Sequence, residues 1–258
     1  MLESVDLEKV ESFLFGKLQE LNELGVINFL KSKGAVASGH FVGTKGGHMD
    51  TYINIKKATE DIDNLTPLAM SLAYDIKDVP ADILLAAPYG AQDLVPLVAM
   101  FYRSFTGRPV QVLKLVKKRR KGETEEDIVW YKDHADKVIG KKVILIDDVI
   151  NTGGSLEDGR DLIEEALGKM VACGVVCNRQ EFFETQMLAD KLRAAIYSLC
   201  IIEVENYEID LDRDLKAQCL LCKGGVSIDQ KIGHGKDFLD SYAEKFPNMS
   251  DWVEKMRG

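Results

Sequence analysis

The stretch VILIDDVINTGGS, residues 143–155, decides the fold. Four apolar residues suited to a buried strand lead into two adjacent acids, and a glycine-rich turn then opens an amphipathic helix over residues 155–167. At the carboxyl end of a parallel strand, such a turn lets the backbone N–H groups of residues 151–155 surround a phosphate. Asp147 and Asp148 can accept hydrogen bonds from vicinal hydroxyls or hold a substrate-bound divalent cation. The pattern predicts a site for a sugar phosphate.

Strand and helix patterns alternate on both sides of this stretch, which predicts an α/β fold with a parallel sheet and helices on both faces. The expected strands are residues 81–86, 110–116, 142–146, 170–177 and 196–204, and the expected helices are residues 66–75, 94–105, 155–167 and 184–195. One or two opening helices within residues 5–30 and a glycine-broken hairpin or hood at residues 34–55 precede them. We therefore expect one domain over residues 1–205, including these helices and the hood, and a C-terminal extension of unknown role over residues 206–258.

Composition narrows the class of protein. The 258 residues carry 33 Lys and Arg against 42 Asp and Glu, a net charge of −9 that disfavours nucleic acid as a partner. The sequence has no apolar run long enough to cross a bilayer, so we expect no membrane partner. The acidic N-terminal residues do not form an export signal, and five cysteines, an odd number, fit reduced thiols. A cytoplasmic location is expected.

The segment 143–155 resembles the phosphoribosyl-pyrophosphate signature of type I phosphoribosyltransferases in every apolar, acidic and glycine position. Asn151 departs from the pattern, because the family normally has Thr, Ser or another small residue there. The resemblance implies the phosphoribosyltransferase fold with a small N-terminal hood, and the C-terminal extension lies outside the common pattern of the family. The alternative for this segment alone is an ordinary strand-to-helix turn with helix capping.

A second segment narrows the resemblance. Residues 175–181, VVCNRQE, are similar to the strand-end motif VxxDRQE of orotate phosphoribosyltransferases, with Asn178 in the usual place of Asp. The resemblance implies that Arg179 meets the carboxylate of the base. A guanidinium pairs a planar carboxylate with two parallel hydrogen bonds, and purine bases offer no such group. The alternative is a surface arginine paired with Glu181 or Glu184.

Two weaker segments fit the same family. Residues 39–58, GHFVGTKGGHMDTYINIKKA, resemble the hood motif, in which Tyr52 and Ile53 would stack on the flat pyrimidine. Lys45 lies one residue away from the lysine of that motif. The loop AAPYGA, residues 86–91, resembles the pyrophosphate loop, although Pro-Tyr-Gly is also a common turn.

The basic run that begins at Lys117 resembles the mobile catalytic loop of the family, with Lys117, Lys118 and Lys121 at its basic positions. Glu123 stands where the family has histidine. When such a loop closes, it excludes water, so its cations stabilise the departing pyrophosphate more strongly. The alternative is a solvated loop.

Taken together, the resemblance implies transfer of a phosphoribosyl group from phosphoribosyl pyrophosphate to orotate in pyrimidine biosynthesis, with Mg²⁺ bound through the substrate near the two acids, in a homodimer. The catalytic candidates are Lys118, Lys121 and Asp148. The donor-binding candidates are Pro88, Tyr89, Gly90, Lys117, Lys118, Lys121, Asp147, Asp148, Asn151, Thr152, Gly153, Gly154 and Ser155. The base-binding candidates are Tyr52, Ile53, Asn151 and Arg179.

Two other functions stay open. One is a phosphoribosyltransferase for another base, which the departures at Asn151, Asn178 and Glu123 favour. The other is a noncatalytic regulator that keeps the sugar-phosphate pocket as a sensor; the basic run argues against it.

The C-terminal extension contains CLLC, residues 219–222, with His234 further on. A Cys-x-x-Cys pair supplies two of the four ligands usual for zinc, and no second pair follows at zinc-finger spacing. A structural metal, a redox pair and a plain packed turn all remain open for Cys219 and Cys222.

Overall fold

The computed structural model describes residues 22–43, 46–119, 126–213 and 215–258, and their contacts divide them into two units. Among these residues, the first unit holds 22–30 and 55–203, and the second holds 31–54 and 204–258. The sequence-based division placed the hood with residues 1–205, whereas the contacts place it with the C-terminal segment. Of the expected opening helices, the described part is α2 (Glu23–Ser32).

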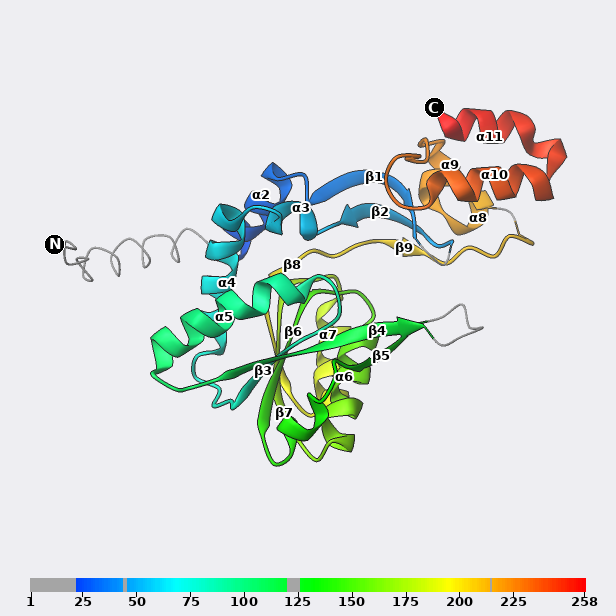
Figure 1. The fold of residues 1–258 in the computed structure, drawn as a ribbon. Helices are drawn as coiled ribbons and strands as arrows, with labels where there is room; N and C mark the ends of the chain where they lie inside the picture. Colours follow the sequence, from blue (N-terminus) through cyan, green and yellow to red (C-terminus); the bar gives the residue numbers. More distant parts are fainter. Residues whose placement is uncertain (1–21, 44–45, 120–125, 214) are drawn as a thin grey trace. The chain divides into compact units, whose positions relative to one another are not determined.

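A six-stranded sheet forms the centre of the first unit, in the order β5-β4-β3-β6-β7-β8 (Figure 1). All neighbouring strands are parallel except β5, which runs antiparallel to β4 at one edge. The strands are β3 (Ile83–Ala86), β4 (Gln111–Arg119), β5 (Glu126–Trp130), β6 (Lys142–Ile150), β7 (Lys169–Asn178) and β8 (Ala195–Ile201). The central strands are continuous apolar runs, as expected for strands covered on both faces, and every residue of β3 is buried.

Helices pack on both faces of this sheet. Helices α4 and α5 contact each other and lie on one face, while α6 and α7 follow β6 and β7 on the other. The helical elements are α3 (Lys56–Thr59), α4 (Ile62–Ile76), α5 (Ala91–Thr106), the 3-10 helix η1 (Ala135–Val138), α6 (Gly154–Glu165) and α7 (Phe182–Leu192). The predicted α/β class, with a mostly parallel sheet, is therefore confirmed.

Two boundaries differ from prediction in ways that matter for the site. Strand β4 extends to Arg119, so Lys117 and Lys118, predicted in a loop, are strand residues paired with Ile128 and Asp127. This end of the hairpin was missed because the residues next to its turn, 117–119 and 126–127, are all charged. Strand β6 extends to Ile150, so the two acids lie within the strand rather than after it.

A three-stranded antiparallel sheet, four short α-helices and one 3-10 helix build the described part of the second unit. The strands are β1 (Val36–Val42), β2 (His48–Ile53) and β9 (Asn206–Tyr207), in the order β1-β2-β9. The helical elements are α8 (Leu215–Gln218), α9 (Leu220–Gly224), α10 (Gly235–Lys245), η2 (Pro247–Met249) and α11 (Ser250–Arg257). The hairpin expected at residues 34–55 is present.

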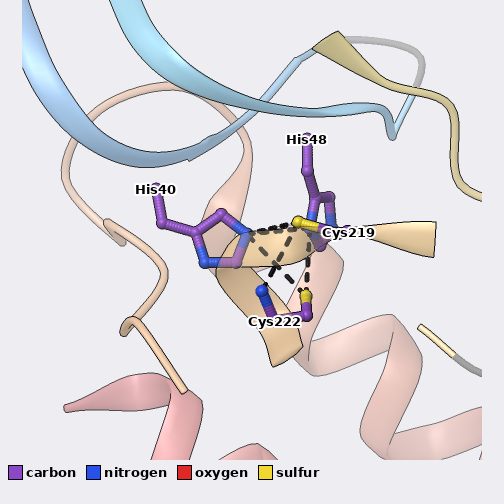
Figure 2. A group of neighbouring side chains, drawn as sticks. All are labelled: His40, His48, Cys219 and Cys222. Carbon is purple, nitrogen blue, oxygen red and sulfur yellow. Dashed lines mark hydrogen bonds between the residues drawn. The ribbon is translucent and has the colours of Figure 1, made fainter. Parts of the chain in front are cut away.

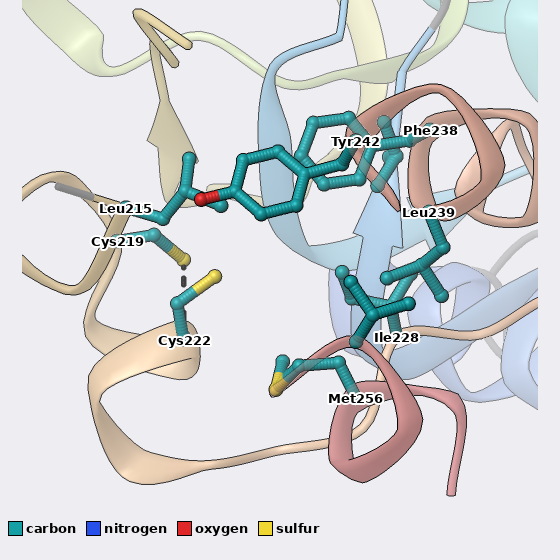
Figure 3. Packing of buried hydrophobic residues seen from close by; sticks show 10 residues of the cluster. Leu215, Cys219, Cys222, Ile228, Phe238, Leu239, Tyr242 and Met256 are labelled. Carbon is teal, nitrogen blue, oxygen red and sulfur yellow. Dashed lines mark hydrogen bonds between the residues drawn. The ribbon is translucent and has the colours of Figure 1, made fainter. Parts of the chain in front are cut away.

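The second unit has its own apolar core, part of which Figure 3 shows. Rings from α10 and α11 contact each other there: Phe238 stacks on Tyr242 at 5.9 Å between centroids, and Tyr242 lies 5.2 Å from Trp252. Backbone hydrogen bonds join the C-terminal segment to β1, because the N–H groups of Asp229 and His234 donate to the carbonyls of His40 and Val42. The C-terminal segment and the hood therefore form one folded body.

Within the described part of the chain, none of the helices is both long and apolar enough to cross a membrane.

Candidate active site

The strand order places a topological switch point at the carboxyl ends of β3 and β6. From β3 the chain moves outward to β4, whereas from β6 it moves in the opposite direction to β7 and β8. The loops that follow two such neighbouring strands diverge to opposite faces of the sheet, and ligands bind between them in open α/β folds. The segments here are residues 87–90 after β3 and the end of β6 with the turn at 151–153.

The two acids of β6 differ in environment. Asp147 is only 6% exposed and accepts a hydrogen bond from the backbone N–H of Asp148 at 2.8 Å, whereas Asp148 is partly exposed. Burial raises the pKa of the Asp147 carboxyl, and the charge of Asp148 raises it further, while Lys117 lowers it. The buried carboxyl thus favours its protonated form, which can both donate to and accept from a hydroxyl group.

The glycine-rich turn has the shape that a backbone cradle requires. Gly153 has φ of 86°, a left-handed conformation that L side chains rarely adopt. A Cβ added there would lie 2.6 Å from a methyl group of Leu188, so glycine is required for space as well. Helix α6 starts at Gly154, and the first N–H groups of a helix have no partner within it. They are available to an anion.

The loop after β3 meets the second acid. Tyr89 has φ of 69°, a left-handed conformation that is uncommon for residues other than glycine. A Cβ at Gly90 would overlap the carboxylate of Asp148, so the backbone of the loop touches this acid directly. The predicted donor-binding segments at residues 88–90 and 147–148 are therefore adjacent.

Three charged side chains surround Tyr89. The ammonium groups of Lys56 and Lys117 each lie 5.5 Å from the centre of its ring, and its hydroxyl donates to Glu126 at 3.0 Å. Sequence reasoning identified Lys117 but missed Lys56 and Glu126. Lys56 lies within the hood motif at residues 39–58, where binding roles were assigned only to Tyr52 and Ile53. Lys121, Glu123 and Lys45 lie outside the described residues.

Arg179 and Asn151 meet at the end of the next strand. An Nη1–H group of Arg179 donates to the side-chain oxygen of Asn151, and the backbone N–H of Arg179 donates to the carbonyl of Ile150 at 3.0 Å. The predicted base-binding arginine thus lies directly beside the predicted phosphate turn. Its partner is the residue that departs from the family pattern.

Asn178, the second departure, has a structural role. It is completely buried, donates to the hydroxyl of Thr185 at 2.7 Å and accepts from the backbone N–H of Gln180 at 3.0 Å. These bonds fix the turn that carries Arg179. Glu181 and Glu184, proposed as alternative partners for Arg179, form a capping box at the start of α7.

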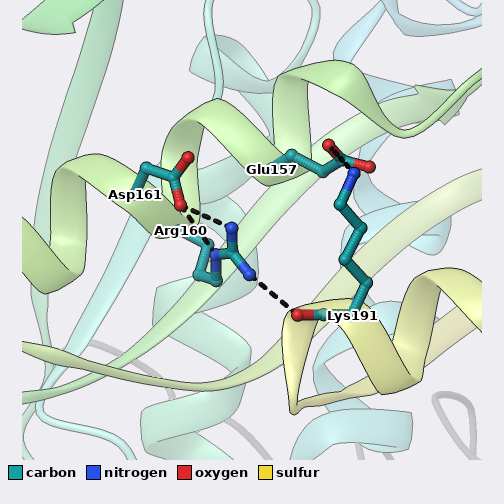
Figure 4. A network of polar contacts seen from close by, with 4 residues as sticks. All are labelled: Glu157, Arg160, Asp161 and Lys191. Carbon is teal, nitrogen blue, oxygen red and sulfur yellow. Dashed lines mark hydrogen bonds and ion pairs between the residues drawn. The ribbon is translucent and has the colours of Figure 1, made fainter.

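A polar network joins the two helices that leave the site (Figure 4). Arg160 on α6 donates to its neighbour Asp161 and, at 2.7 Å, to the backbone carbonyl of Lys191 at the end of α7. The ammonium group of Lys191 pairs with Glu157 on α6. Because α6 follows the phosphate turn and α7 follows Arg179, this network helps to hold both segments in place.

Tyr52 and Ile53, the remaining base-binding candidates, lie on β2 of the second unit. The Tyr52 ring packs against Phe41 of β1 at 5.7 Å between centroids, and both candidates are partly buried.

A family model described as "Phosphoribosyl transferase domain" matches residues 66–186, the region that contains every donor-binding candidate. The orotate phosphoribosyltransferase of Methanopyrus kandleri is 34% identical over 161 residues, which are 62% of this chain and 80% of that protein. The orotate phosphoribosyltransferase of Chlorobium phaeobacteroides strain BS1 is 28% identical over 204 residues, covering 79% of this chain and 92% of the relative.

The fold is also similar to solved structures. The orotate phosphoribosyltransferase of Mycobacterium tuberculosis, crystallised with Fe(III) dicitrate, superposes with a TM-score of 0.52 at 15% identity. The match covers 72% of this chain and 97% of that structure. At this identity the likeness concerns the fold alone.

Proposed function

The chain belongs to the phosphoribosyltransferase family, and from this premise we propose that it transfers the phosphoribosyl group of phosphoribosyl pyrophosphate to orotate, forming orotidine 5′-phosphate and releasing pyrophosphate. The observation that carries this proposal is the juxtaposition of the Asp147–Asp148 pair, the turn at residues 151–155 and the loop at residues 88–90 at the switch point of the sheet. Two orotate phosphoribosyltransferases as relatives support the choice of base.

The proposed donor site uses backbone and carboxyl groups. N–H groups of residues 152–155 bind the 5′-phosphate, helped by the dipole of α6. Asp147 and Asp148 hydrogen-bond the two ribose hydroxyls, and the loop at Tyr89 and Gly90 binds pyrophosphate through its amides.

The carboxylate of Asp148 also fits a magnesium ion carried by the substrate, because Mg²⁺ prefers oxygen ligands and usually binds through one or two carboxylates and substrate phosphates. The ion would supply neutralisation of pyrophosphate charge. Asp147, whose raised pKa favours the protonated form, is better suited to a hydroxyl group than to a cation.

For the base, Arg179 is the proposed partner of the orotate carboxylate, and Asn151 orients its guanidinium. Tyr52 and Ile53 remain the predicted stacking residues. The reaction needs no enzymatic nucleophile, since the donor already carries a good leaving group. Catalysis then consists of positioning and charge stabilisation, with Lys118 and Lys121 acting on the departing pyrophosphate and Lys117 beside Tyr89.

A homodimer and a cytoplasmic location are part of the same proposal. The cytoplasmic location is supported by five free, buried cysteines, which fit a reducing compartment. The homodimer rests on the family resemblance.

The direct test is pyrophosphate release by the full chain with Mg²⁺, phosphoribosyl pyrophosphate and one base at a time: orotate, uracil, hypoxanthine or adenine. We expect pyrophosphate release with orotate. Arg179→Ala should lower kcat/KM for orotate by about 10²–10³-fold, because the carboxylate of bound orotate then loses its charged partner. Arg103→Ala, on the exposed side of α5, is the matched control and should leave the rate unchanged.

Turnover of a purine in preference to orotate would contradict the proposed base and indicate a phosphoribosyltransferase for another base. If no pyrophosphate is released with any of the four bases but the donor still binds tightly, the chain would instead be the noncatalytic regulator considered above.

A further inference from the structure

We propose that His40, His48, Cys219 and Cys222 bind one zinc ion, which joins the hood hairpin to the C-terminal helices within the second unit. These four residues are here called the His–Cys cluster, and Figure 2 shows their side chains converging on one point. The proposal does not rest on the donor site, because the donor-binding candidates belong to the first unit.

The distances between the ligand atoms fit one tetrahedral ion. Zinc bonds of about 2.0–2.1 Å to nitrogen and 2.3 Å to sulfur place a tetrahedral nitrogen and sulfur about 3.5 Å apart, and two nitrogens about 3.3 Å apart. The Nε2 atom of His40 lies 3.7 and 3.8 Å from the sulfurs of Cys219 and Cys222, and the Nδ1 atom of His48 lies 3.4 Å from Cys222. The two nitrogens are 2.8 Å apart, so an ion would separate them by about half an ångström.

Local structure brings the two histidines of the hairpin together. His48 opens β2 opposite Val42 of β1, and His40 precedes Val42 by two residues on the same strand. The pairing of β1 with β2 is irregular between Ser38 and Phe41, the part that contains His40, and the two imidazole rings lie edge-on to each other with 4.8 Å between centroids. The backbone of this strand also holds the C-terminal segment, through the bond from Asp229 to the carbonyl of His40.

The two cysteines are arranged around the start of α9. Cys219 is the N-cap residue, and its sulfur accepts a hydrogen bond from the backbone N–H of Cys222 at 3.4 Å. An N–H group directed at sulfur stabilises the thiolate form that a metal requires. The Cys-x-x-Cys spacing therefore presents two sulfurs from a single turn, as structural zinc sites do.

A contact outside the cluster orients the imidazole of His40. The Nδ1 atom of His40 lies 2.8 Å from the carbonyl oxygen of Val226, so this nitrogen carries the proton and leaves Nε2 as a free lone pair directed into the cluster. Metal-bound histidines usually donate their other N–H to a carbonyl or carboxylate in this way.

The surroundings indicate a structural ion rather than a catalytic one. All four ligands are buried, with 0–1% of each residue exposed, and Phe238 packs edge-on against His48 at 4.7 Å between centroids. The core of the second unit adjoins the cysteines (Figure 3). Four protein ligands fill a tetrahedral shell and leave no position for water, and two thiolates neutralise the charge of Zn²⁺ in this dry environment.

The first experiment measures metal in the full chain, purified without a histidine tag and under reducing conditions. We expect inductively coupled plasma mass spectrometry to find one zinc ion per chain. Exchange for Co²⁺ should give the visible absorption of tetrahedral cobalt and a thiolate charge-transfer band. Chains that contain no zinc and give neither band when Co²⁺ is added would overturn the proposal, as would a Cys219–Cys222 disulfide in the freshly purified reduced protein.

Variants then assign the ligands. Cys222→Ser and His48→Asn should each retain less than about a tenth of the zinc of the parent chain, since a closed site needs all four ligands. Cys200→Ala, equally buried but in the central sheet, and His234→Ala, an exposed histidine of the same unit, should retain all of it. If a variant fails to fold, the cobalt spectrum of the unaltered chain still decides. Full zinc content in both ligand variants would refute the assignment.

Discussion

The two units differ in how the residues of their proposed sites are distributed along the sequence. In the first unit, the donor site is built mainly from one continuous stretch, residues 143–155, with the loop at residues 88–90 beside it. In the second unit, the His–Cys cluster is built from side chains as far apart as 182 positions in sequence. A phosphate site made of backbone N–H groups needs consecutive residues, whereas the side chains that bind a metal need only lie close together in the folded chain. A motif therefore reveals the first site, and only the fold reveals the second.

The two units also differ in what fixes them. The first has a sheet covered by helices on both faces, with continuous apolar strands at its centre. The second has a small core around four buried polar ligands. Small cores often depend on a metal or a cross-link, so the second unit should depend on zinc while the first should not.

Removal of the metal tests this contrast with the largest expected effect. Zinc contributes about 10 kcal/mol or more to the folding of small zinc domains, so a strong chelator should unfold the second unit. Hydrogen exchange would show faster exchange in residues 206–258 and unchanged protection in β6 and β7. Equal loss of protection in both units, or no change in either, would contradict the contrast.

The second largest effect is expected when a positive charge that acts on pyrophosphate is removed. We expect Lys121→Ala to lower turnover about 100-fold, by analogy with the loss of one oxyanion donor, with little change in thermal stability. Steady-state pyrophosphate release measures the effect, and Lys141→Ala, an exposed lysine before β6, is the control. Turnover within twofold of the parent would remove Lys121 from the mechanism.

A methyl group at Gly90 should produce a smaller effect confined to the first unit. Gly90→Ala would force the Asp148 carboxylate to move, so the KM for phosphoribosyl pyrophosphate should rise about tenfold. Gly224→Ala, where a Cβ meets no atom closer than 3.8 Å, should leave the KM unchanged. An unaltered KM for Gly90→Ala would show that Asp148 does not hold the donor.

The smallest effect is expected at Asn178. Asp at this position can accept from both Thr185 and Gln180, so Asn178→Asp should change the free energy of unfolding by less than about 1.5 kcal/mol and leave the preference for orotate intact. Thermal unfolding and the base comparison check both statements. A switch to another base would give Asn178 a role in specificity that its buried position does not suggest.

Much of the first unit could be predicted because local sequence determines it. Continuous apolar runs predicted the central strands. The segment 143–155 predicted that the two adjacent acids and the glycine-rich turn lie together at the carboxyl end of one strand. Most of β4 was predicted as a strand, but its end at residues 117–119 was mispredicted as a loop and β5 was missed, since the pairing of Lys117 with Ile128 depends on contacts that no local pattern encodes. Arg179 and Asn151 were both identified, but their contact became visible only in the fold.

The His–Cys cluster shows where such prediction stops. His234 was considered with Cys219 and Cys222 because it follows them in sequence, yet it lies on the surface near Asp237. The true neighbours are His40 and His48, which were treated as part of the hood motif. Their spacing, eight residues apart across a glycine-rich hairpin, was the available signal.

A crystal structure of the chain with phosphoribosyl pyrophosphate and Mg²⁺ tests the donor site most directly. We predict the 5′-phosphate within hydrogen-bonding distance of the backbone N–H groups of residues 152–155, with the ribose hydroxyls on Asp147 and Asp148. A donor bound elsewhere, or a turn that stays empty at saturating donor while both carboxylates face away from the sugar, would contradict the proposed function.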